Sequence, residues 1–513
     1  MFNKKLISKV IGSLLILEAA FMLLCVATAI YYHSTDTWPF IISFLITLGT
    51  GYGMVRMGWE APTTMTRRDA FAVVTLTWVT FSFFGSMPYL FGGFFGSFKL
   101  FDLPGQMHIA TDAFFETMSG FTTTGASMLN DVEAQLESHQ AMLVWRSLSQ
   151  WIGGLGIVFF TIAIIPSMVG NSMKVFSAEA TGPIRSKMHP RLSATAMRIW
   201  WVYIILTVCC GLLFNLAGMD PFSAINYAMT TTATGGFSIH NDSIAHFNSP
   251  AIEYIALAFQ FLSGINFSML FMIFAVRKLN GWREFKRSEK NKWHDFISNE
   301  EARFYVILVL SCSALIAIML MASNGYGLEP AFRKATFHVV SCMTTTGILC
   351  DNVGSWPHIT WIILFILMFV GACSGSTTGG FKSARALMIL KVVRNEFVHM
   401  LHPRAVLPVK LNGKAMPSQL VNSLMAFFTI YILFCIGTVA LMMSIGTDIT
   451  NSATISLSCI TNAGLPLNEL GPEMTWSSLP IWTKWVCTML MLLGRLEIFN
   501  VLVLFTTPYW KDN

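Results

Sequence analysis

The segments FTTTGAS (121–127), TTATGGFS (231–238), MTTTGILC (343–350) and ITNAGLPL (460–467) are four copies of one short pattern. Aligned as Thr-x-x-Gly, the copies put four glycines in register at separations of 110, 112 and 117 residues: Gly125, Gly235, Gly347 and Gly464. Recurrence at so regular a period indicates a repeated structural unit. The chain is therefore predicted to contain one unit four times.

The residues around each copy define that unit. Each copy ends a moderately apolar stretch that opens with an acidic residue, in turn Asp112, Asp220, Glu329 and Asp448. A long apolar run precedes each stretch and another follows it. The second runs share a further glycine: Gly154, Gly264, Gly371 and Gly494. The unit is predicted to be a helix, a short helix, a Thr/Gly loop and a second helix.

The composition indicates that most of this chain lies in lipid. Of the 513 residues, 54% are hydrophobic and only 12% charged, against about a quarter charged in soluble domains. Runs long enough to cross a bilayer are clearest at 10–30, 70–95, 199–217, 305–322 and 421–445. The run at 10–30 and another at 39–55 precede the first unit. We therefore predict an all-α polytopic membrane protein with two leading transmembrane helices (1–69) and four units (70–197, 198–302, 303–417 and 418–513) around one central ion pathway.

The distribution of charge predicts the orientation. With the amino terminus inside, 27 lysines and arginines fall on the cytoplasmic side and four on the other, and the net charges of the two sides are +17 and −11. Such an excess of basic residues is typical of cytoplasmic loops. Both termini are predicted to be cytoplasmic. The overall charge of +6 then reflects two opposite fields and does not indicate nucleic-acid binding.

The four loops have the chemistry of a cation path. Backbone that enters a membrane without crossing it is tolerated only where it is buried in protein or lines a wet cavity. Glycine lets carbonyl groups turn in directions that other residues resist, and rings of carbonyls can replace the hydration shell of an alkali cation. Each preceding short helix would direct the negative end of its dipole at the same centre. Acidic residues that follow the loops are expected at the outer mouth, where they would concentrate cations, although solvated acidic loops are the alternative: Asp131, Asp242, Asp351 and Glu469.

Two further features are candidates for controlling that path. The stretch 371–382 interrupts a long apolar run with four glycines, at about 1 kcal/mol each relative to alanine in a helix, so we predict a loop at membrane depth; a simple kink is the alternative. Arg495 lies deep in an apolar helix, where an arginine is a functional candidate by default, unless a neighbouring helix neutralises it. Arg146 lies near a predicted helix end and is expected to extend to the interface.

The four Thr/Gly loops, the stretch GACSGSTTGGFKSAR (371–385) and the helix sequence GRLEIF (494–499) resemble the Trk/Ktr/HKT superfamily of potassium transporters, and the two leading helices are most similar to its bacterial TrkH-type members. The resemblance covers essentially the whole chain. It implies potassium selectivity, because all four loops have glycine where sodium-preferring members have serine in the first. The implied potassium-binding filter residues are Thr123, Thr124, Gly125, Ala233, Thr234, Gly235, Thr345, Thr346, Gly347, Asn462, Ala463 and Gly464.

The resemblance also implies a gate, partners and a location. The implied gate lies beneath the filter and consists of Gly371, Gly375, Ser376, Thr377, Thr378, Gly379, Gly380 and the pathway residue Arg495. A homodimer in the bacterial inner membrane is implied, with a peripheral cytosolic nucleotide-binding subunit of the TrkA type and no covalently bound cofactor. The basic segments 276–303 and 391–414 could contact that subunit, or could simply follow the positive-inside rule and attract anionic membrane lipid.

Two rival functions remain to be weighed. A secondary transporter coupled to sodium or protons, with a cation site at the membrane midplane, also has repeats and broken helices. Its repeats are usually inverted, whereas units of two spans each keep one orientation, which favours a pore-like path. A membrane enzyme would need a cluster of titratable residues, and the sequence contains no HExxH motif or nucleophile signature.

Overall fold

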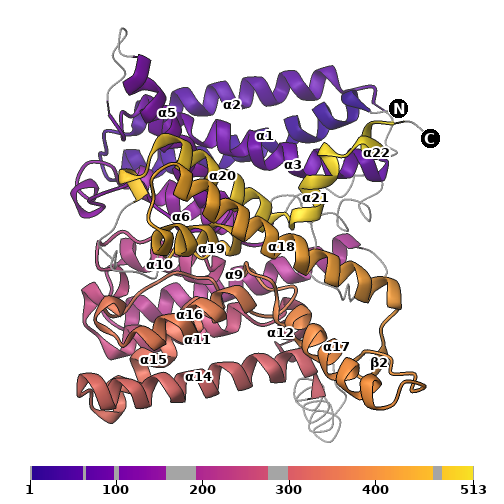
Figure 1. Ribbon diagram of the computed structural model, residues 1–513. Helices are drawn as coiled ribbons and strands as arrows, with labels where there is room; N and C mark the ends of the chain where they lie inside the picture. The colour runs from indigo at the N-terminus through magenta and orange to yellow at the C-terminus, as the bar shows by residue number, and fades with distance from the viewer. Residues whose placement is uncertain are drawn as a thin grey trace, which may run out of the picture.

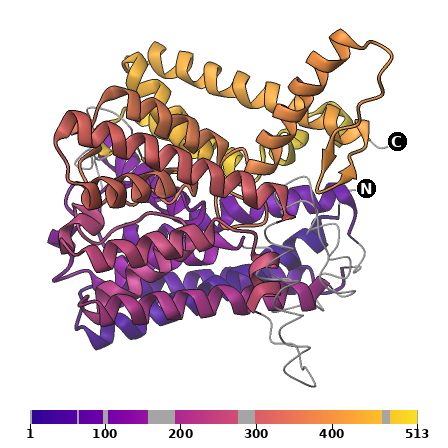
Figure 2. The ribbon, with the colours of Figure 1, turned by 90° about the horizontal axis from the view of Figure 1, so that it is seen from below.

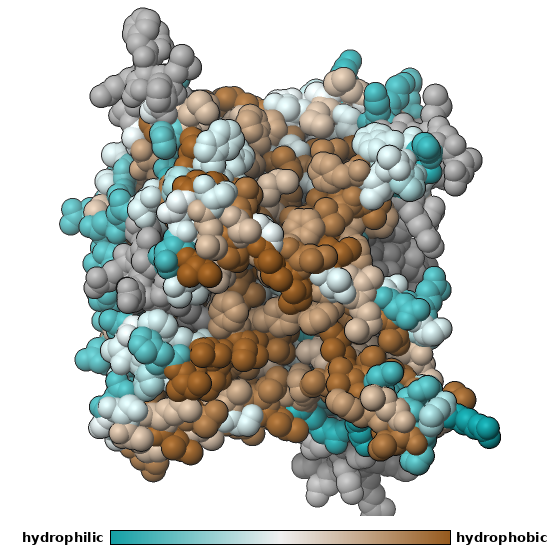
Figure 3. Space-filling model, in the orientation of Figure 1, coloured by the Kyte–Doolittle hydropathy of each residue, from teal (hydrophilic) through white to brown (hydrophobic). Residues whose placement is uncertain are grey.

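The computed structural model describes residues 3–61, 65–96, 103–156, 192–274, 298–465 and 476–511. This part of the chain is almost entirely helical, and its one sheet is a two-stranded antiparallel hairpin of β1 (Lys410–Leu411) and β2 (Lys414–Ala415). The long helices run in roughly one direction across the molecule, and both chain ends lie at the same end of the helix bundle (Figures 1 and 2). Hydrophobic residues form a broad belt between two more polar ends (Figure 3), as expected of a membrane protein.

The two leading helices form a tight antiparallel pair, α1 (Lys4–Tyr31) and α2 (Thr37–Met57). A Cβ atom on Gly12 would lie 2.6 Å from the carbonyl oxygen of Gly51, and one on Gly51 would lie 2.9 Å from that of Gly12. Small residues at a crossing let helix backbones approach closely in membranes. The predicted leading pair is thus confirmed, and glycine explains its close packing.

The four predicted units follow in chain order. The first helices of the units are α3 (Arg67–Gly85), α9 (Leu192–Leu216), α14 (Glu300–Asn324) and α18 (Ser418–Ser444). The short helices are α5 (Leu103–Phe121), α10 (Pro221–Ala233), α15 (Leu328–Met343) and α19 (Ile449–Thr461). The second helices are α6 (Gln140–Gly154), α11 (Pro250–Ser263), α16 (His358–Val370) and α20 (Ile481–Arg495). Further helices are α4 (Met87–Phe91), α12 (Phe267–Phe274), α17 (Ser383–Leu401), α21 (Ile498–Leu502) and α22 (Thr507–Trp510), with 3-10 turns η1 (Glu133–Gln135), η2 (Ser243–Phe247), η3 (Val353–Ser355), η4 (Trp476–Ser478) and η5 (Val503–Phe505).

Acidic residues begin three of the four short helices, as the sequence predicts. Asp220 caps α10 by accepting a hydrogen bond from the Ser223 backbone N–H at 2.9 Å, and Asp448 caps α19 in the same way through Thr450. Glu329 lies in the first turn of α15, where the helix dipole favours negative charge. The expectation for Asp112 is wrong, because α5 begins nine residues earlier at Leu103. Asp112 instead pairs with Lys484 of α20 at 2.6 Å.

The second helices of the second, third and fourth units break, although the sequence predicted an interruption only in the third. The α11/α12 pair bends by 106° and the α20/α21 pair by 109°, while α6 ends at Gly154 and α16 at Val370. Glycines bring these helices against the ends of the short helices: a Cβ atom on Gly153 would lie 1.8 Å from the Phe121 carbonyl oxygen, and one on Gly494 would lie 2.1 Å from that of Ile460. Of the shared glycines, Gly494 makes this contact within its own unit, whereas Gly154 and Gly264 lie against the next unit: their Cβ atoms would lie 3.1 Å from Ala233 Cα and 2.8 Å from Thr344 Cγ2.

Six described helices are long and apolar enough to cross a membrane, or eight spans if each bent pair is one. The chain is thus a multi-pass membrane protein with inserted short helices. The expected unit boundaries stay predictions; two of them, 69/70 and 302/303, fall within the first turns of α3 and α14.

Candidate functional site

The four short helices end in the same way. The residue after each helix, or one residue beyond it, has a left-handed backbone: φ is 53° at Thr123, Thr234 and Thr345 and 57° at Asn462. The next backbone N–H then donates to the carbonyl five residues earlier, for example from Thr124 to Ser119 at 2.9 Å, which is the Schellman pattern of helix ends. Threonine is an outlier in this region because it is β-branched. Such strain is concentrated at functional sites.

This shared geometry corrects the register of the second repeat. Gly235 was expected to match Gly125, but the Gly235 N–H makes the bond that the Thr124 N–H makes in the first loop. Gly236, whose φ is 82°, is the equivalent of Gly125 and Gly347, whose φ angles are 83° and 78°. The separations between equivalent glycines become 111, 111 and 117 residues. The Thr-x-x-Gly pattern selected Gly235, because the residue three positions before Gly236 is Ala233. The more even spacing was the signal that could have identified Gly236.

The four loops close into a ring through their backbones. A Cβ atom on the loop glycine would lie 2.1–2.4 Å from a carbonyl oxygen of the next loop, which leaves no room for a side chain. These contacts run from Gly125 to Gly235, from Gly236 to Thr346, from Gly347 to Ala463 and from Gly464 back to Thr124. The Asn462 amide also donates to the Thr124 hydroxyl at 3.0 Å, so the fourth loop, which departs most from the pattern, contacts the first through its unusual side chain.

A buried ion pair supports the outer part of the first two loops. Arg146 Nε donates to Glu116 Oε1 at 2.8 Å, and both side chains are almost fully buried. Arg146 also donates to the Ser238 carbonyl at 2.9 Å and the Ser127 hydroxyl at 3.0 Å. The expectation that Arg146 extends to the interface is therefore wrong: Glu116, thirty residues earlier, neutralises it inside the protein. One turn further along α6, the Gln150 side-chain amide donates to the Gly235 carbonyl at 2.7 Å and accepts from the Phe237 N–H at 3.1 Å.

Sequence reasoning missed Glu116, Arg146 and Gln150 as parts of this site. The available signal was the spacing of Arg146 and Gln150, which are four residues apart and so share one face of a helix. Glu116 lies seven residues before the left-handed Thr123, and the equivalent positions are Tyr227, His338 and Ile455. Tyr227 bonds Ser238 at 2.6 Å and His338 lies 3.8 Å from Cys350. In the first three units the residue at this position thus contacts the segment that follows the loop, through a carboxylate, a phenol and an imidazole in turn.

The acidic residues expected at the outer mouth have specific partners. Asp131 accepts from the Asn241 amide at 2.9 Å, and this bond lowers the pKa of the Asp131 carboxyl. Burial raises the pKa of Asp351, but the hydrogen bond from Tyr326 and the nearby Lys334 outweigh it, so its pKa is lowered overall. Asp242 precedes the turn η2 without a capping hydrogen bond from its side chain, and it lines a polar cavity of about 480 Å³ between the second and third units. Glu469 lies outside the described residues.

The stretch 371–382 is not helical and lies between α16 and α17, as predicted. It contacts three of the four loops at the ends of their short helices. The Thr234 hydroxyl donates to Thr377 Oγ1 at 3.2 Å, and the Gly379 N–H donates to the Thr345 hydroxyl at 2.7 Å. The Gly380 N–H donates to the Thr461 carbonyl at 2.9 Å. Because its contacts are to the left-handed residues and helix ends, this segment adjoins the ring on the side opposite the acidic segments.

Arg495 joins this segment to the first unit. Its guanidinium donates to the Thr377 carbonyl at 2.9 Å and to the carbonyls of Gly153 and Gly154 at 2.5 and 2.7 Å. Those carbonyls belong to the end of α6, where the helix dipole is negative and favours a cation. The neighbouring Glu497 pairs instead with Arg385 of α17 at 2.6 Å. The arginine thus fastens the interrupted segment of the third unit to the first.

Comparisons with known proteins agree over nearly the full length. A family model described as "TrkH: Cation transport protein" matches residues 40–511. The Trk system potassium uptake protein TrkH of Halomonas elongata is 34% identical, with 99% of each chain covered, and the protein of the same name in Escherichia coli K12 is 32% identical at the same coverage. The crystal structure of the potassium transporter TrkH from Vibrio parahaemolyticus aligns with a TM-score of 0.85, at 30% identity and 99% coverage of each chain.

Proposed function

Because the chain belongs to the TrkH family of cation transport proteins, we propose that it takes up potassium ions as the translocating subunit of a Trk-type system. The observation that carries the proposal is the closed ring of backbone contacts from Gly125 through Gly236 and Gly347 to Gly464. A single ring contributed by all four units is the arrangement a selectivity filter requires. The full-length relatives named as potassium uptake proteins favour potassium as the ion.

The filter is proposed to consist of the residues that the sequence indicated, with Gly236 added to the second loop. Carbonyl oxygens of successive residues would replace the ion's water shell. The short helices α5, α10, α15 and α19 end at the ring, so the negative ends of their dipoles lie there and favour a cation. An anion would be repelled by the same field.

The gate is proposed to be the segment 371–382 together with Arg495. The segment bonds to Thr234, Thr345 and the Thr461 carbonyl, so ions leaving the ring would meet it. Arg495 adds a positive charge and fastens the segment to α6 through Thr377. Opening would require these bonds to break. That makes the segment a suitable element for a regulatory subunit to control.

The charge distribution supports a bacterial inner-membrane location with both termini in the cytoplasm, and both termini do lie at one end of the bundle (Figure 1). The proposed partners are a second copy of the chain, membrane lipid and a cytosolic nucleotide-binding subunit. The basic helix α17 and the hairpin β1–β2 are described parts of its candidate docking face; residues 276–297 of the other candidate segment, 276–303, lie outside the described residues.

The function is tested by ion uptake into proteoliposomes that contain the purified chain. Uptake of rubidium, a tracer for potassium, is expected to be competed by potassium and weakly by sodium. Imposing or collapsing sodium and proton gradients separates a channel-like path from coupled transport, because only coupled uptake follows those gradients. If no alkali cation enters with or without a nucleotide-binding partner subunit, the proposed function is wrong.

Replacing Arg495 with alanine is expected to raise rubidium uptake in the absence of any partner. The change removes a positive charge and three hydrogen bonds that hold the gate, and a loss of about 1.4 kcal/mol from the closed state corresponds to about tenfold more open protein. Arg495→Lys keeps the charge and is the matched control. An alanine variant that is folded and no faster than the parent would show that Arg495 does not restrain the gate.

A further inference from the structure

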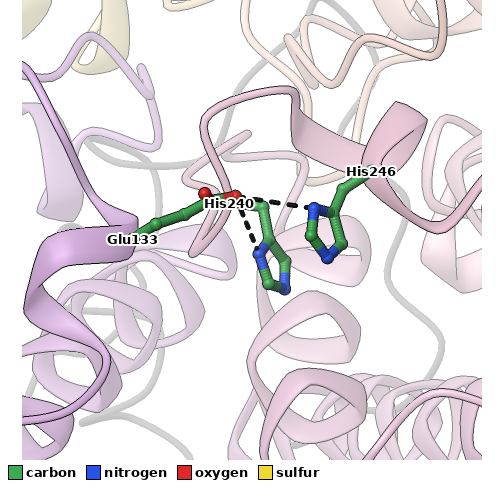
Figure 4. A group of neighbouring side chains, drawn as sticks. All are labelled: Glu133, His240 and His246. Carbon is green, nitrogen blue, oxygen red and sulfur yellow. Dashed lines mark hydrogen bonds and ion pairs between the residues drawn. The ribbon is translucent and has the colours of Figure 1, made fainter.

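Three side chains with metal-binding groups converge where the first and second units meet (Figure 4). Glu133 belongs to the turn η1, between α5 and α6, whereas His240 and His246 belong to the segment between α10 and α11. One carboxylate oxygen, Glu133 Oε1, lies 3.1 Å from His240 Nδ1 and 3.5 Å from His246 Nδ1. All three ligand atoms lie within 4.8 Å of one another. Neither the potassium path nor the gate uses these residues.

We propose that Glu133, His240 and His246 form a binding site for a divalent transition-metal ion, for which Zn²⁺ is the probe. Two imidazoles and one carboxylate are a ligand set that zinc accepts, with a fourth position open to water. A tetrahedral ion at about 2.0–2.1 Å from each ligand needs ligand atoms about 3.4 Å apart. The separations of 3.1 and 3.5 Å between Glu133 Oε1 and the two Nδ1 atoms are already close to that value. Hard cations such as Mg²⁺ prefer oxygen ligands and would be excluded.

The surroundings of the two histidines favour metal binding. The Nδ1 atoms of both rings face the same carboxylate oxygen of Glu133, so an ion between the three groups would be near all of them. The two rings stack with centroids 3.7 Å apart and planes 7° apart. An ion bound by both histidines must lie near the plane of each ring. The two rings must therefore rotate out of their parallel stack before they can bind one ion together. The His246 side chain is 43% exposed and has solvent on one side into which it can rotate.

The site would join two segments that follow the filter ring. His240 comes four residues after Gly236, and the hydroxyl of Ser238 accepts from the His240 N–H at 3.0 Å. The segments already meet through Asn241, whose side chain accepts from the Val132 N–H at 2.9 Å and donates to Asp131 at 2.9 Å. A bound metal would add a stronger link between the same two units. Metal binding is therefore expected to stabilise the folded protein, because an ion that binds only the folded state raises its stability.

The experiment is calorimetric titration of Zn²⁺ into the untagged full chain in detergent, with thermal unfolding measured in parallel. The expected results are one ion bound per chain and a higher unfolding temperature with Zn²⁺ than with Mg²⁺. His246→Ala and Glu133→Gln are each expected to weaken binding by about tenfold or more, since even losing an outer partner of a metal ligand costs 10- to 100-fold. His246 is exposed, so its variant should fold.

Matched controls come from groups of the same chemistry outside the cluster. His108→Ala and Glu137→Gln replace an exposed histidine and an exposed carboxylate and should bind Zn²⁺ like the parent. The proposal is overturned if the parent does not bind Zn²⁺, or if His246→Ala and Glu133→Gln both bind it as the parent does. Neither readout depends on ion transport, so its failure would leave the proposed function untouched.

Discussion

Gly236→Ala is expected to lower the preference for potassium over sodium by about tenfold or more. The new Cβ atom would lie 2.1 Å from the Thr346 carbonyl oxygen, and relieving that overlap must move the backbone of the second or third loop. Overpacking of this kind typically costs 1–3 kcal/mol, and 1.4 kcal/mol is a factor of ten. Sodium competition against rubidium uptake in proteoliposomes measures the change. Gly125→Ala should behave alike, because its Cβ atom would lie 2.2 Å from the Gly235 carbonyl oxygen.

The matched control is Gly218→Ala, between α9 and α10. Gly218 also has a positive φ, 104°, but a Cβ atom there meets nothing within 4 Å. It therefore reproduces the backbone strain of an alanine at positive φ without the contact in the ring. If Gly236→Ala and Gly218→Ala keep the same ion preference, the ring of loop glycines is not the filter.

Arg146→Met is expected to destabilise the protein by about 3–5 kcal/mol, the usual cost of removing one partner of a buried ion pair. Glu116 would keep a buried charge without its guanidinium, and the Ser238 carbonyl would lose a donor. The double variant Arg146→Met/Glu116→Met should recover part of that loss, because no isolated charge remains. Thermal unfolding in detergent of the parent, both single variants and the double variant gives the coupling energy between the pair.

A partly exposed ion pair is the control for the buried pair. Lys391 of α17 pairs with Glu300 of α14, and each side chain is about a quarter exposed. Exposed pairs contribute about 0–1 kcal/mol, so Lys391→Met should unfold close to the parent. Should Arg146→Met be no less stable than Lys391→Met, the support assigned to the buried pair would be wrong.

The repeated architecture could be predicted because the units share local features of their sequences. Apolar runs and the Thr/Gly pattern recur in every unit, acidic residues begin three of the four short helices, and the glycine-rich stretch 371–382 cannot remain regular helix cheaply. These are short-range properties, which one unit shares with the next. The leading helices, the short helices and the interrupted segment could therefore be predicted without coordinates.

What could not be predicted depends on contacts between distant residues. The Thr-x-x-Gly pattern selects Gly235, whereas it is Gly236 that has the positive φ and the close contact with Thr346 of the third loop. Arg146 was misplaced because its partner Glu116 belongs to another helix. The start of α5 was missed because Asp112, which pairs with Lys484, has the same acidic character as a helix cap. In each case the role of the residue was inferred from its neighbours in the sequence, whereas it is determined by a contact with a residue far away in the sequence.

The four walls of the ring belong to one polypeptide, and this has a consequence for how the protein can evolve. In a channel of four identical chains, one codon change alters all four walls at once. Here the equivalent positions in the four short helices are Glu116, Tyr227, His338 and Ile455, and a single substitution changes one wall while three keep their form. If the ring selects the ion, as we propose, its preference can be changed one wall at a time.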